Sequence, residues 1–192
     1  LTIEEVAGLA NSADNLPEGM ETGLFETGIY EASAPTFPNG CHVCELEIDQ
    51  ETGQIELLRY TIVDDVGRVI NPLTLKGQIH GGVVQGLGQV FFEDLIYDPK
   101  DGQMLTGSFM DYAMPRASDF CLFDVISNEV PTTTNPVGAK GGGECGTVGS
   151  VAAAMNAILD ALSVLNIKHL DLPATPQKIW EAIKSSDQLQ NF

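Results

Sequence analysis

The chain has 192 residues, of which 43% are hydrophobic and 19% are charged. This composition supplies enough apolar side chains for one buried core and excludes an intrinsically disordered tail. The 27 acidic residues outnumber the 9 basic ones, which gives a formal net charge of −18. Because contacts to nucleic acid and to anionic membranes depend on Lys and Arg, neither is an expected partner.

Cysteine usage and apolar runs predict the compartment. Four cysteines are too few for a disulfide scaffold, and the acidic start LTIEEVAGLA lacks the basic residues of a signal peptide. We therefore expect a reducing, cytoplasmic location. No apolar run is expected to reach the ~18 residues of a membrane span. The first residue is Leu1 rather than Met, which suggests a processed or truncated piece of a longer protein.

The first 35 residues are predicted to form a lead-in helix and strand. Thr2 and Glu5 have the spacing of a capping box, and apolar residues at helical spacing follow. Residues 24–31 are expected to be extended. A core is expected over residues 36–184, followed by a polar tail over residues 185–192 that frays.

Residues 41–49 and 54–65 are rich in β-formers and flank a turn that ends in Gly53, so they are predicted to pair as a long hairpin. The hairpin contains a C-x-x-C motif, Cys41 to Cys44. In a strand, residues three apart point to opposite faces, and no second cysteine pair follows. Ordinary packing is therefore favoured over a zinc or redox site.

A glycine-rich helix is predicted from Pro72, with Asn71 as its N-cap, to about residue 94. Its five glycines each cost up to ~1 kcal/mol relative to Ala, so the helix must gain from something packed closely against its bare face. Gln78, Gln85 and Gln89 form one stripe. The stripe either faces a polar ligand or faces solvent. His80 is interpreted as a packed histidine rather than a metal ligand.

The second half of the chain is predicted to alternate irregular segments with regular elements. Residues 107–116 form an irregular aromatic segment that either lines a pocket or fills the core. A strand is expected over residues 120–130 and an amphipathic helix over residues 150–165. A last helix is expected to start at Thr175 and Pro176.

Residues 135–150, NPVGAKGGGECGTVGS, place Glu144 among six glycines. A P-loop is rejected, because Glu144 stands where a phosphate-binding loop needs Lys. A dinucleotide-binding G-x-G-x-x-G is disfavoured, because no buried-strand pattern precedes the glycines. Two interpretations of Glu144 stay open: a general base held close to a bulky ligand, or an acid that stabilises a helix N-terminus.

Three motifs occur in one order: GQIHGGVVQGLGQ from Gly77, GSFMDYAMPR from Gly107, and the glycine loop. Together they resemble the C-terminal molybdenum-cofactor-binding region of the molybdenum hydroxylases, which include xanthine dehydrogenase, aldehyde oxidoreductase and the large subunit of carbon monoxide dehydrogenase. The resemblance runs from about Gly40 to Trp180. The hairpin and the closing PATPQKIW look closest to the carbon-monoxide-dehydrogenase-like branch.

The resemblance implies roles for particular residues. Glu144 matches the family's glutamate beside the molybdenum and is the expected catalytic base. Gly143 sits where the family's backbone passes the metal, and Gln78 matches a glutamine that hydrogen-bonds the pterin. No residue of this chain is expected to ligate the metal. The implied cofactor is molybdopterin, with its cytosine dinucleotide form as one option.

The resemblance also implies a fold, a reaction and partners. We expect an α+β fold in which a mixed sheet with a long hairpin is packed by helices, forming half of the cofactor-binding region. The implied enzyme is an oxidoreductase that hydroxylates an aldehyde, N-heterocycle or similar electron-poor carbon, and carbon monoxide also stays open. The other half of the molybdenum domain, iron–sulfur and FAD domains or subunits, and oligomerisation are expected. The alternative is a non-catalytic assembly subunit that keeps the fold.

Overall fold

The computed structural model describes the chain from residue 1 to residue 190, in two compact units that divide after Ser33. In the first unit, helix α1 (Ile3–Ala10) has the predicted capping box: Glu5 N donates to Thr2 Oγ1, and Thr2 N donates to Glu5 Oε2. A short 3₁₀ helix, η1 (Ala13–Asn15), follows. Residues 24–31 were expected to be a strand, but they form none, because they have no ladder partner within the described chain.

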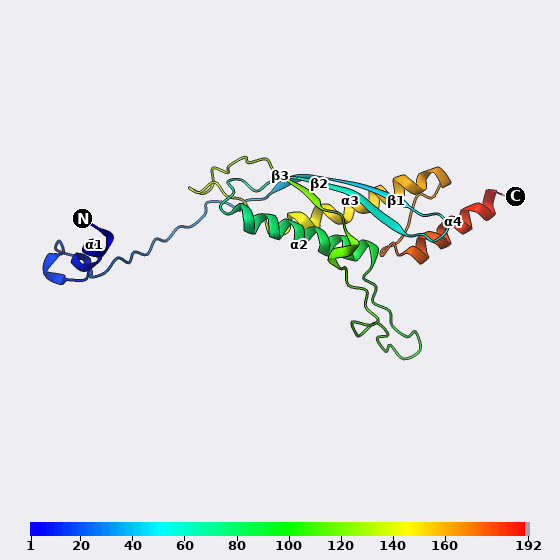
Figure 1. The fold of residues 1–192 in the computed structure, drawn as a ribbon, viewed down its shortest axis with the longest axis horizontal. Helices are drawn as coiled ribbons and strands as arrows, with labels where there is room; N and C mark the ends of the chain where they lie inside the picture. Colours follow the sequence, from blue (N-terminus) through cyan, green and yellow to red (C-terminus); the bar gives the residue numbers. More distant parts are fainter. Residues whose placement is uncertain (191–192) are drawn as a thin grey trace. The chain divides into compact units, whose positions relative to one another are not determined.

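From Ala34 onward the fold is built on a three-stranded sheet in the order β1-β2-β3 (Figure 1). Strands β1 (Asn39–Ile48) and β2 (Ile55–Asp65) pair antiparallel, and β3 (Phe123–Ser127) pairs parallel to β2. The parallel pair requires a crossover, which α2 supplies. The prediction of an α+β fold with a mixed sheet and a long hairpin is therefore confirmed.

The hairpin turn explains why Gly53 is needed. Its φ of 73° lies in the left-handed region, and a Cβ at this position would overlap the carbonyl oxygen of Pro176. Asp49 Oδ1 accepts hydrogen bonds from Glu51 N and Thr52 N, at 2.7 and 3.2 Å. The turn thus packs closely against the start of the last helix.

Two central helices cover the sheet. Helix α2 (Pro72–Phe91) begins as predicted, because Asn71 Oδ1 accepts hydrogen bonds from Leu73 N and Thr74 N. Helix α3 (Cys145–Leu162) packs against both α2 and β1. It starts five residues earlier than expected, because Gly146 and Gly149 carry no apolar side chain that would mark a helical repeat.

Two shorter elements close the described chain. The 3₁₀ turn η3 (Ser163–Leu165) extends α3, and α4 (Pro176–Gln190) starts at the predicted proline. A fraying tail was expected over residues 185–192. The helix continues to Gln190, and residues 191–192 lie outside the described part of the chain. A further 3₁₀ turn, η2 (Ala117–Asp119), precedes β3.

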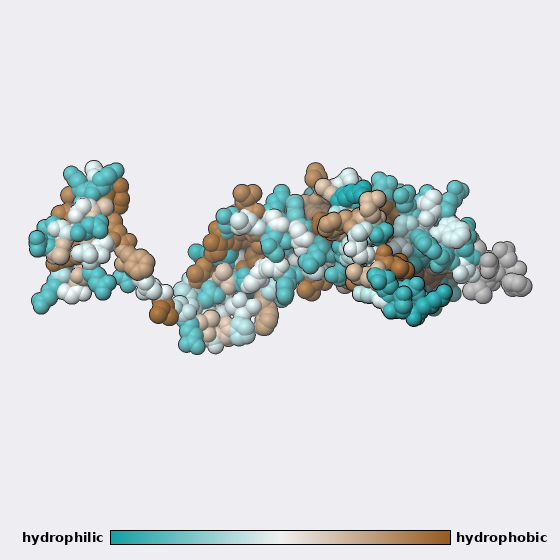
Figure 2. Space-filling view, turned by 90° about the horizontal axis from the view of Figure 1, so that it is seen from below, coloured by the Kyte–Doolittle hydropathy of each residue, from teal (hydrophilic) through white to brown (hydrophobic). Residues whose placement is uncertain are grey.

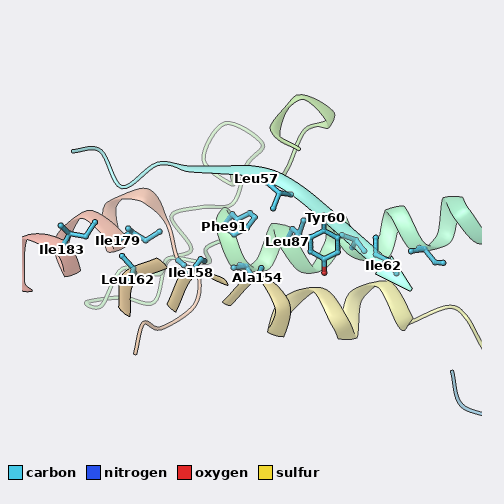
Figure 3. Packing of buried hydrophobic residues seen from close by; sticks show 14 residues of the cluster. Leu57, Tyr60, Ile62, Leu87, Phe91, Ala154, Ile158, Leu162, Ile179 and Ile183 are labelled. Carbon is cyan, nitrogen blue, oxygen red and sulfur yellow. The ribbon is translucent and has the colours of Figure 1, made fainter. Parts of the chain in front are cut away.

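The core lies between the sheet and the helices (Figure 3). Each fully buried aliphatic side chain in this core stabilises the fold by about 1.5–3 kcal/mol relative to the same side chain exposed to water. Tyr60 is fully buried in the cluster and makes an edge contact with Phe123. The members come from β2, α2, α3 and α4, and include Leu57, Tyr60, Ile62, Leu87, Phe91, Ala154, Ile158, Leu162, Ile179 and Ile183.

One helical span, Cys145–Leu165, is long and apolar enough to cross a membrane by length and composition alone. The expectation that no run reaches this length is therefore wrong for α3 and η3. Packing accounts for part of this apolarity, since Ala154, Ile158 and Leu162 are buried in the core.

Candidate functional site

Glu144 occupies the N-cap position of α3, immediately before Cys145. Its side chain is exposed and accepts no capping hydrogen bond from the first turn of the helix. A side-chain cap requires that bond. The geometry therefore does not support the interpretation of Glu144 as a side-chain cap, although its charge still lies at the favourable end of the helix dipole.

The loop before Glu144 contains no strand. Within residues 131–144, the sole β-contact is an isolated bridge between Ala139 and Gly67. The strand that a dinucleotide-binding fingerprint requires is thus missing from this part of the chain. Gly138 instead takes a φ of 76°, and its carbonyl accepts hydrogen bonds from Arg68 N and Thr132 N.

Gln78 and the glycine loop meet directly. Gln78 Nε2 donates a 2.9 Å hydrogen bond to the carbonyl oxygen of Gly143, the residue before Glu144. The two predicted cofactor-binding residues, which lie 65 positions apart in sequence, are thus brought together beside the predicted base.

An ion pair that was not predicted from the sequence holds the same loop close to Glu144. Lys140 Nζ lies 2.5 Å from Asp65 Oδ2, and both side chains are largely buried. Asp65 Oδ1 also accepts hydrogen bonds from Gly67 N and Val130 N. Burial raises the pKa of Asp65, but these hydrogen bonds outweigh burial and lower that pKa below its ordinary value. The pair fixes the end of β2 to a point four residues before Glu144.

Two cavities flank this loop. The first, which we call the amide cavity, has a volume of about 390 Å³ and runs along the start of α2. Its lining includes Arg68, Asn71, Gln78, Lys140 and Gly142. Its polar side chains are cationic groups, amides and the hydroxyl of Thr74.

The second, which we call the carboxylate cavity, has a volume of about 290 Å³. Glu144 and Asp64 both line it, together with His42 and Cys145. Burial, and next the charge of Asp64, raise the pKa of Cys145 to about 11, so the thiol stays protonated at neutral pH. Neither His42 nor Asp64 was predicted from the sequence as a site residue. Asp64 is one of two adjacent acids at the end of a buried strand, and His42 lies within the C-x-x-C motif of the other hairpin strand.

The glutamine stripe on α2 faces solvent in this chain. Gln78, Gln85 and Gln89 are all exposed. Gln85 Oε1 accepts a 3.3 Å hydrogen bond from Thr147 Oγ1, so two members of the stripe contact the loop or the helix that carries Glu144.

The remaining candidate residues take packing roles. His80 packs edge-on against Phe123, and burial lowers the pKa of its imidazole. Cys44 points towards the core while Cys41 is exposed, which matches the predicted strand alternation. No group of three His, Cys, Asp or Glu side chains suited to a metal ion occurs among the described residues.

The aromatic segment at residues 107–116 does not fill the core. Phe109 and Met110 are 88% and 94% exposed, and the segment lines an open pocket of about 650 Å³ together with Phe92. Of the two interpretations of this segment, the pocket is the one observed.

Comparison with known proteins supports a single family. The model of a family described as "Molybdopterin cofactor-binding domain" matches residues 1–121. The nicotine 6-hydroxylase large subunit of Paenarthrobacter nicotinovorans is 41% identical over 174 residues, which cover 91% of this chain and 21% of that protein. This chain thus spans about a fifth of the length of that curated relative.

Two solved structures have the same fold. Reconstituted CO dehydrogenase from Oligotropha carboxidovorans matches with a TM-score of 0.87 and 31% identity, over 98% of this chain and 23% of that one. Quinoline 2-oxidoreductase from Pseudomonas putida 86 matches with a TM-score of 0.82 and 36% identity, over 94% and 23%. Together with the family model, these similarities show that the chain belongs to the molybdopterin cofactor-binding family of the molybdenum hydroxylases.

Proposed function

We propose that this chain is part of the cofactor-binding region of a molybdenum hydroxylase in which Glu144 is the catalytic base. The observation that carries the proposal is an exposed glutamate at a helix N-cap that makes no capping bond. The backbone beside it is held by Gln78 and, four residues earlier, by the Asp65–Lys140 ion pair. A backbone held in this way fixes the position of the Glu144 carboxylate, which is then free to act on a group that does not belong to this chain, such as the bound cofactor.

The lining of the amide cavity fits a pterin cofactor with phosphate groups. Its volume of about 390 Å³ lies in the usual range for ligand pockets. The amide of Gln78 offers both donors and acceptors, and Arg68 supplies positive charge near a bound phosphate, whereas the charge of Lys140 is already paired with Asp65. Cβ atoms built at Gly77 and Gly143 would meet nothing within 4 Å, so bare backbone is open to close approach.

When bound, the molybdenum cofactor supplies the redox chemistry by which oxygen derived from water is added to an electron-poor carbon. The contribution of this chain is to position groups and to move a proton. Glu144 accepts a proton at a carboxylate oxygen during the reaction. Gln78 holds the Gly143 carbonyl, which fixes the backbone from which the Glu144 side chain extends.

The substrate, partners and location are part of the same proposal. The matched relatives are named for nicotine, quinoline, CO and aldehydes, which keeps N-heterocycles, aldehydes and carbon monoxide as candidate substrates. We assign iron–sulfur and flavin groups to other domains or subunits, since relatives are named as large subunits or chains. The cytosine dinucleotide form of the cofactor, an oligomeric enzyme and a cytoplasmic location complete the proposal.

The test is Glu144→Gln in the complete enzyme that contains this chain. The amide keeps the size of the side chain but cannot accept the proton, so molybdenum content should stay while enzyme reduction slows by about 10²–10⁴-fold. Reduction is measured by stopped-flow absorbance with a panel of quinoline, nicotine, benzaldehyde and carbon monoxide. Glu45→Gln, on the exposed outer face of β1, is the matched control and should leave the rate unchanged.

The outcomes separate two functions. Slow reduction with full molybdenum, measured by elemental analysis, supports the base role. Normal reduction in Glu144→Gln would assign Glu144 to the helix end and reject it as the base. Wild-type enzyme that binds molybdenum but is reduced by no panel compound would favour a non-catalytic assembly subunit.

A further inference from the structure

A buried polar cluster lies on the carboxylate cavity, and the proposed function makes no use of it. It consists of Asp64 and Tyr60 from β2 and His42 from β1. The side chains of Asp64 and His42 are only 2% and 5% exposed, and Tyr60 is fully buried. His42 Nδ1 lies 2.9 Å from Tyr60 Oη, and His42 Nε2 lies 3.5 Å from Asp64 Oδ1.

Two glycines make room for this cluster. A Cβ at Gly149 of α3 would lie 2.6–2.7 Å from three ring atoms of His42. A Cβ at Gly40 would overlap Asp64 Oδ1. Both contacts are far closer than packed atoms allow, so side chains at either position would displace the His42–Asp64 pair.

The hydrogen bonds define the protonation of the cluster. Burial, followed by the charges of Cys44 and Asp64, raises the pKa of Tyr60, so this phenol stays neutral and can donate to His42 Nδ1. An imidazole that accepts at Nδ1 carries its proton at Nε2, which lies 3.5 Å from Asp64 Oδ1. His42 therefore stabilises the Asp64 carboxylate at Oδ1.

The second carboxylate oxygen has no such partner. Asp64 Oδ2 is buried and accepts no hydrogen bond within the described part of the chain, because the nearby Cys145 thiol donates to the carbonyl oxygen of Gly142 instead. An unpaired buried carboxylate oxygen is costly, and a purely structural network would satisfy it. The titratable groups beside Asp64 are His42 on β1, Tyr60 on its own strand, and Cys145 and Glu144 on or next to α3. Of these, Glu144 is the group that the proposed function leaves holding a proton.

We propose that Asp64 receives the proton that Glu144 takes up, through the cavity that both residues line, and so returns Glu144 to its basic form. In this step an O–H bond of Glu144 breaks, an O–H bond forms at Asp64 Oδ2, and no electron moves. Asp64 then gives the proton to water in the cavity, which carries it to solvent, so that Asp64 regains its carboxylate before the next turnover. Water within the cavity is the carrier, since about 290 Å³ has room for it. His42 and Tyr60 are positioning residues. This inference rests on the proposed role of Glu144.

The test is Asp64→Asn in the complete enzyme. Asparagine keeps the shape but cannot accept a proton, so the first reduction by the fastest panel compound should stay near the wild-type rate. Steady-state kcat should fall about tenfold or more, less than the ~10²–10⁴-fold range for loss of the base itself, and KM should change little. Added sodium acetate, a small carboxylate, should restore kcat in the variant and have no effect on the wild type.

Proton release gives a readout that is independent of turnover. A pH-indicator dye in weakly buffered solution should show release together with reduction in the wild type and delayed release in Asp64→Asn. The matched control is Asp171→Asn, which breaks the exposed His169–Asp171 pair and should change neither measurement.

The outcomes distinguish this inference from the proposed function. A kcat within twofold of wild type in fully loaded Asp64→Asn overturns the relay, whereas normal first reduction in Glu144→Gln overturns the base role itself. If Asp64→Asn loses molybdenum, the relay is tested with Tyr60→Phe instead. This substitution removes a single hydroxyl, the one that contacts His42 Nδ1. A kcat lowered about fivefold and restored by acetate supports the relay, and an unchanged kcat overturns it.

Discussion

The Asp65–Lys140 ion pair makes the shape of the glycine loop depend on a buried charge. Lys140 is four residues before Glu144, and its partner also receives two backbone N–H groups. Removing one partner of a buried pair leaves the other charge uncompensated, which costs more than the pair contributes. The charge of Asp65 therefore fixes the loop that carries the proposed base.

Asp65→Asn should destabilise the chain at pH 7 by about 1–3 kcal/mol. Because the pKa of Asp65 is lowered in the folded state, the stability it contributes is present above the unfolded value of about 3.9 and is lost as the pH falls through the folded pKa. Urea unfolding at pH 7, 5 and 3 should show the gap between wild type and variant closing at low pH. A gap that stays constant with pH would contradict this account.

At the scale of single residues, the sequence predicted a site residue only where the residue type was unusual for the surrounding segment. Glu144 and Gln78 stood out because a lone acid among glycines and an amide stripe on a helix need partners. Asp64 and Asp65 did not, since two acids at a strand end are common in turns. Their partners, His42 and Lys140, lie 22 and 75 residues away, and only the folded chain brings them together.

The contact between α2 and α3 depends on bare backbone. A Cβ at Gly146 would lie 2.6 Å from Ile79 O and 2.9 Å from Val83 N, which are backbone atoms that cannot rotate away. Gly86 of α2 is covered by the side chain of Ser150 and the carbonyl oxygen of Thr147, both on α3. Cβ atoms at Gly77 and Gly81, in the first half of α2, would meet nothing within 4 Å. The glycines of α2 therefore fall into two sets. One set, such as Gly86, allows the close contact with α3, and the other, Gly77 and Gly81, leaves bare backbone on an exposed face.

Gly146→Ala should destabilise the fold by about 1–3 kcal/mol, because the two helices must separate to accept the methyl group. Gly81→Ala is the matched control: its Cβ meets nothing within 4 Å, so it should stabilise the helix by up to about 1 kcal/mol. Urea unfolding of the wild type and of each variant measures the two changes in the free energy of unfolding. Equal effects of the two substitutions would contradict the close-packing account.

At the scale of elements, the sequence predicted the type of each long element better than its ends. Asn71 and Pro72 gave the start of α2 because a cap is a local signal. The start of α3 was missed, because its first turns are glycine-rich and show no apolar period. Residues 24–31 were wrongly expected to form a strand, since β-formers form a ladder only where a neighbouring strand is available.

From Ala34 onward the molecule combines strong negative charge with exposed apolar side chains. Figure 2 shows apolar patches among the polar surface of this unit. Phe109 and Met110 are nearly fully exposed on the segment between α2 and β3, and Val148 of α3 is 72% exposed. Apolar patches beyond a few hundred Å² mark interaction surfaces. This surface fits a protein that works in contact with other domains.

The chain on its own should therefore self-associate despite its net charge of −18. Charge repulsion is screened over about 10 Å at 0.1 M salt, whereas apolar attraction is not weakened by salt. Light scattering should show a mean mass that rises with protein concentration, and rises further when salt is added. A monomer at every concentration and salt level would contradict the prediction.

A double variant, Phe109→Ser with Met110→Ser, tests whether the aromatic segment carries this association. Because both side chains are exposed and outside the core, folding should be unchanged while the mean mass falls. Val164→Ser, which changes another exposed apolar residue at 78% exposure, is the control. If both sets of substitutions lower the mass equally, association depends on total apolar surface rather than on this segment.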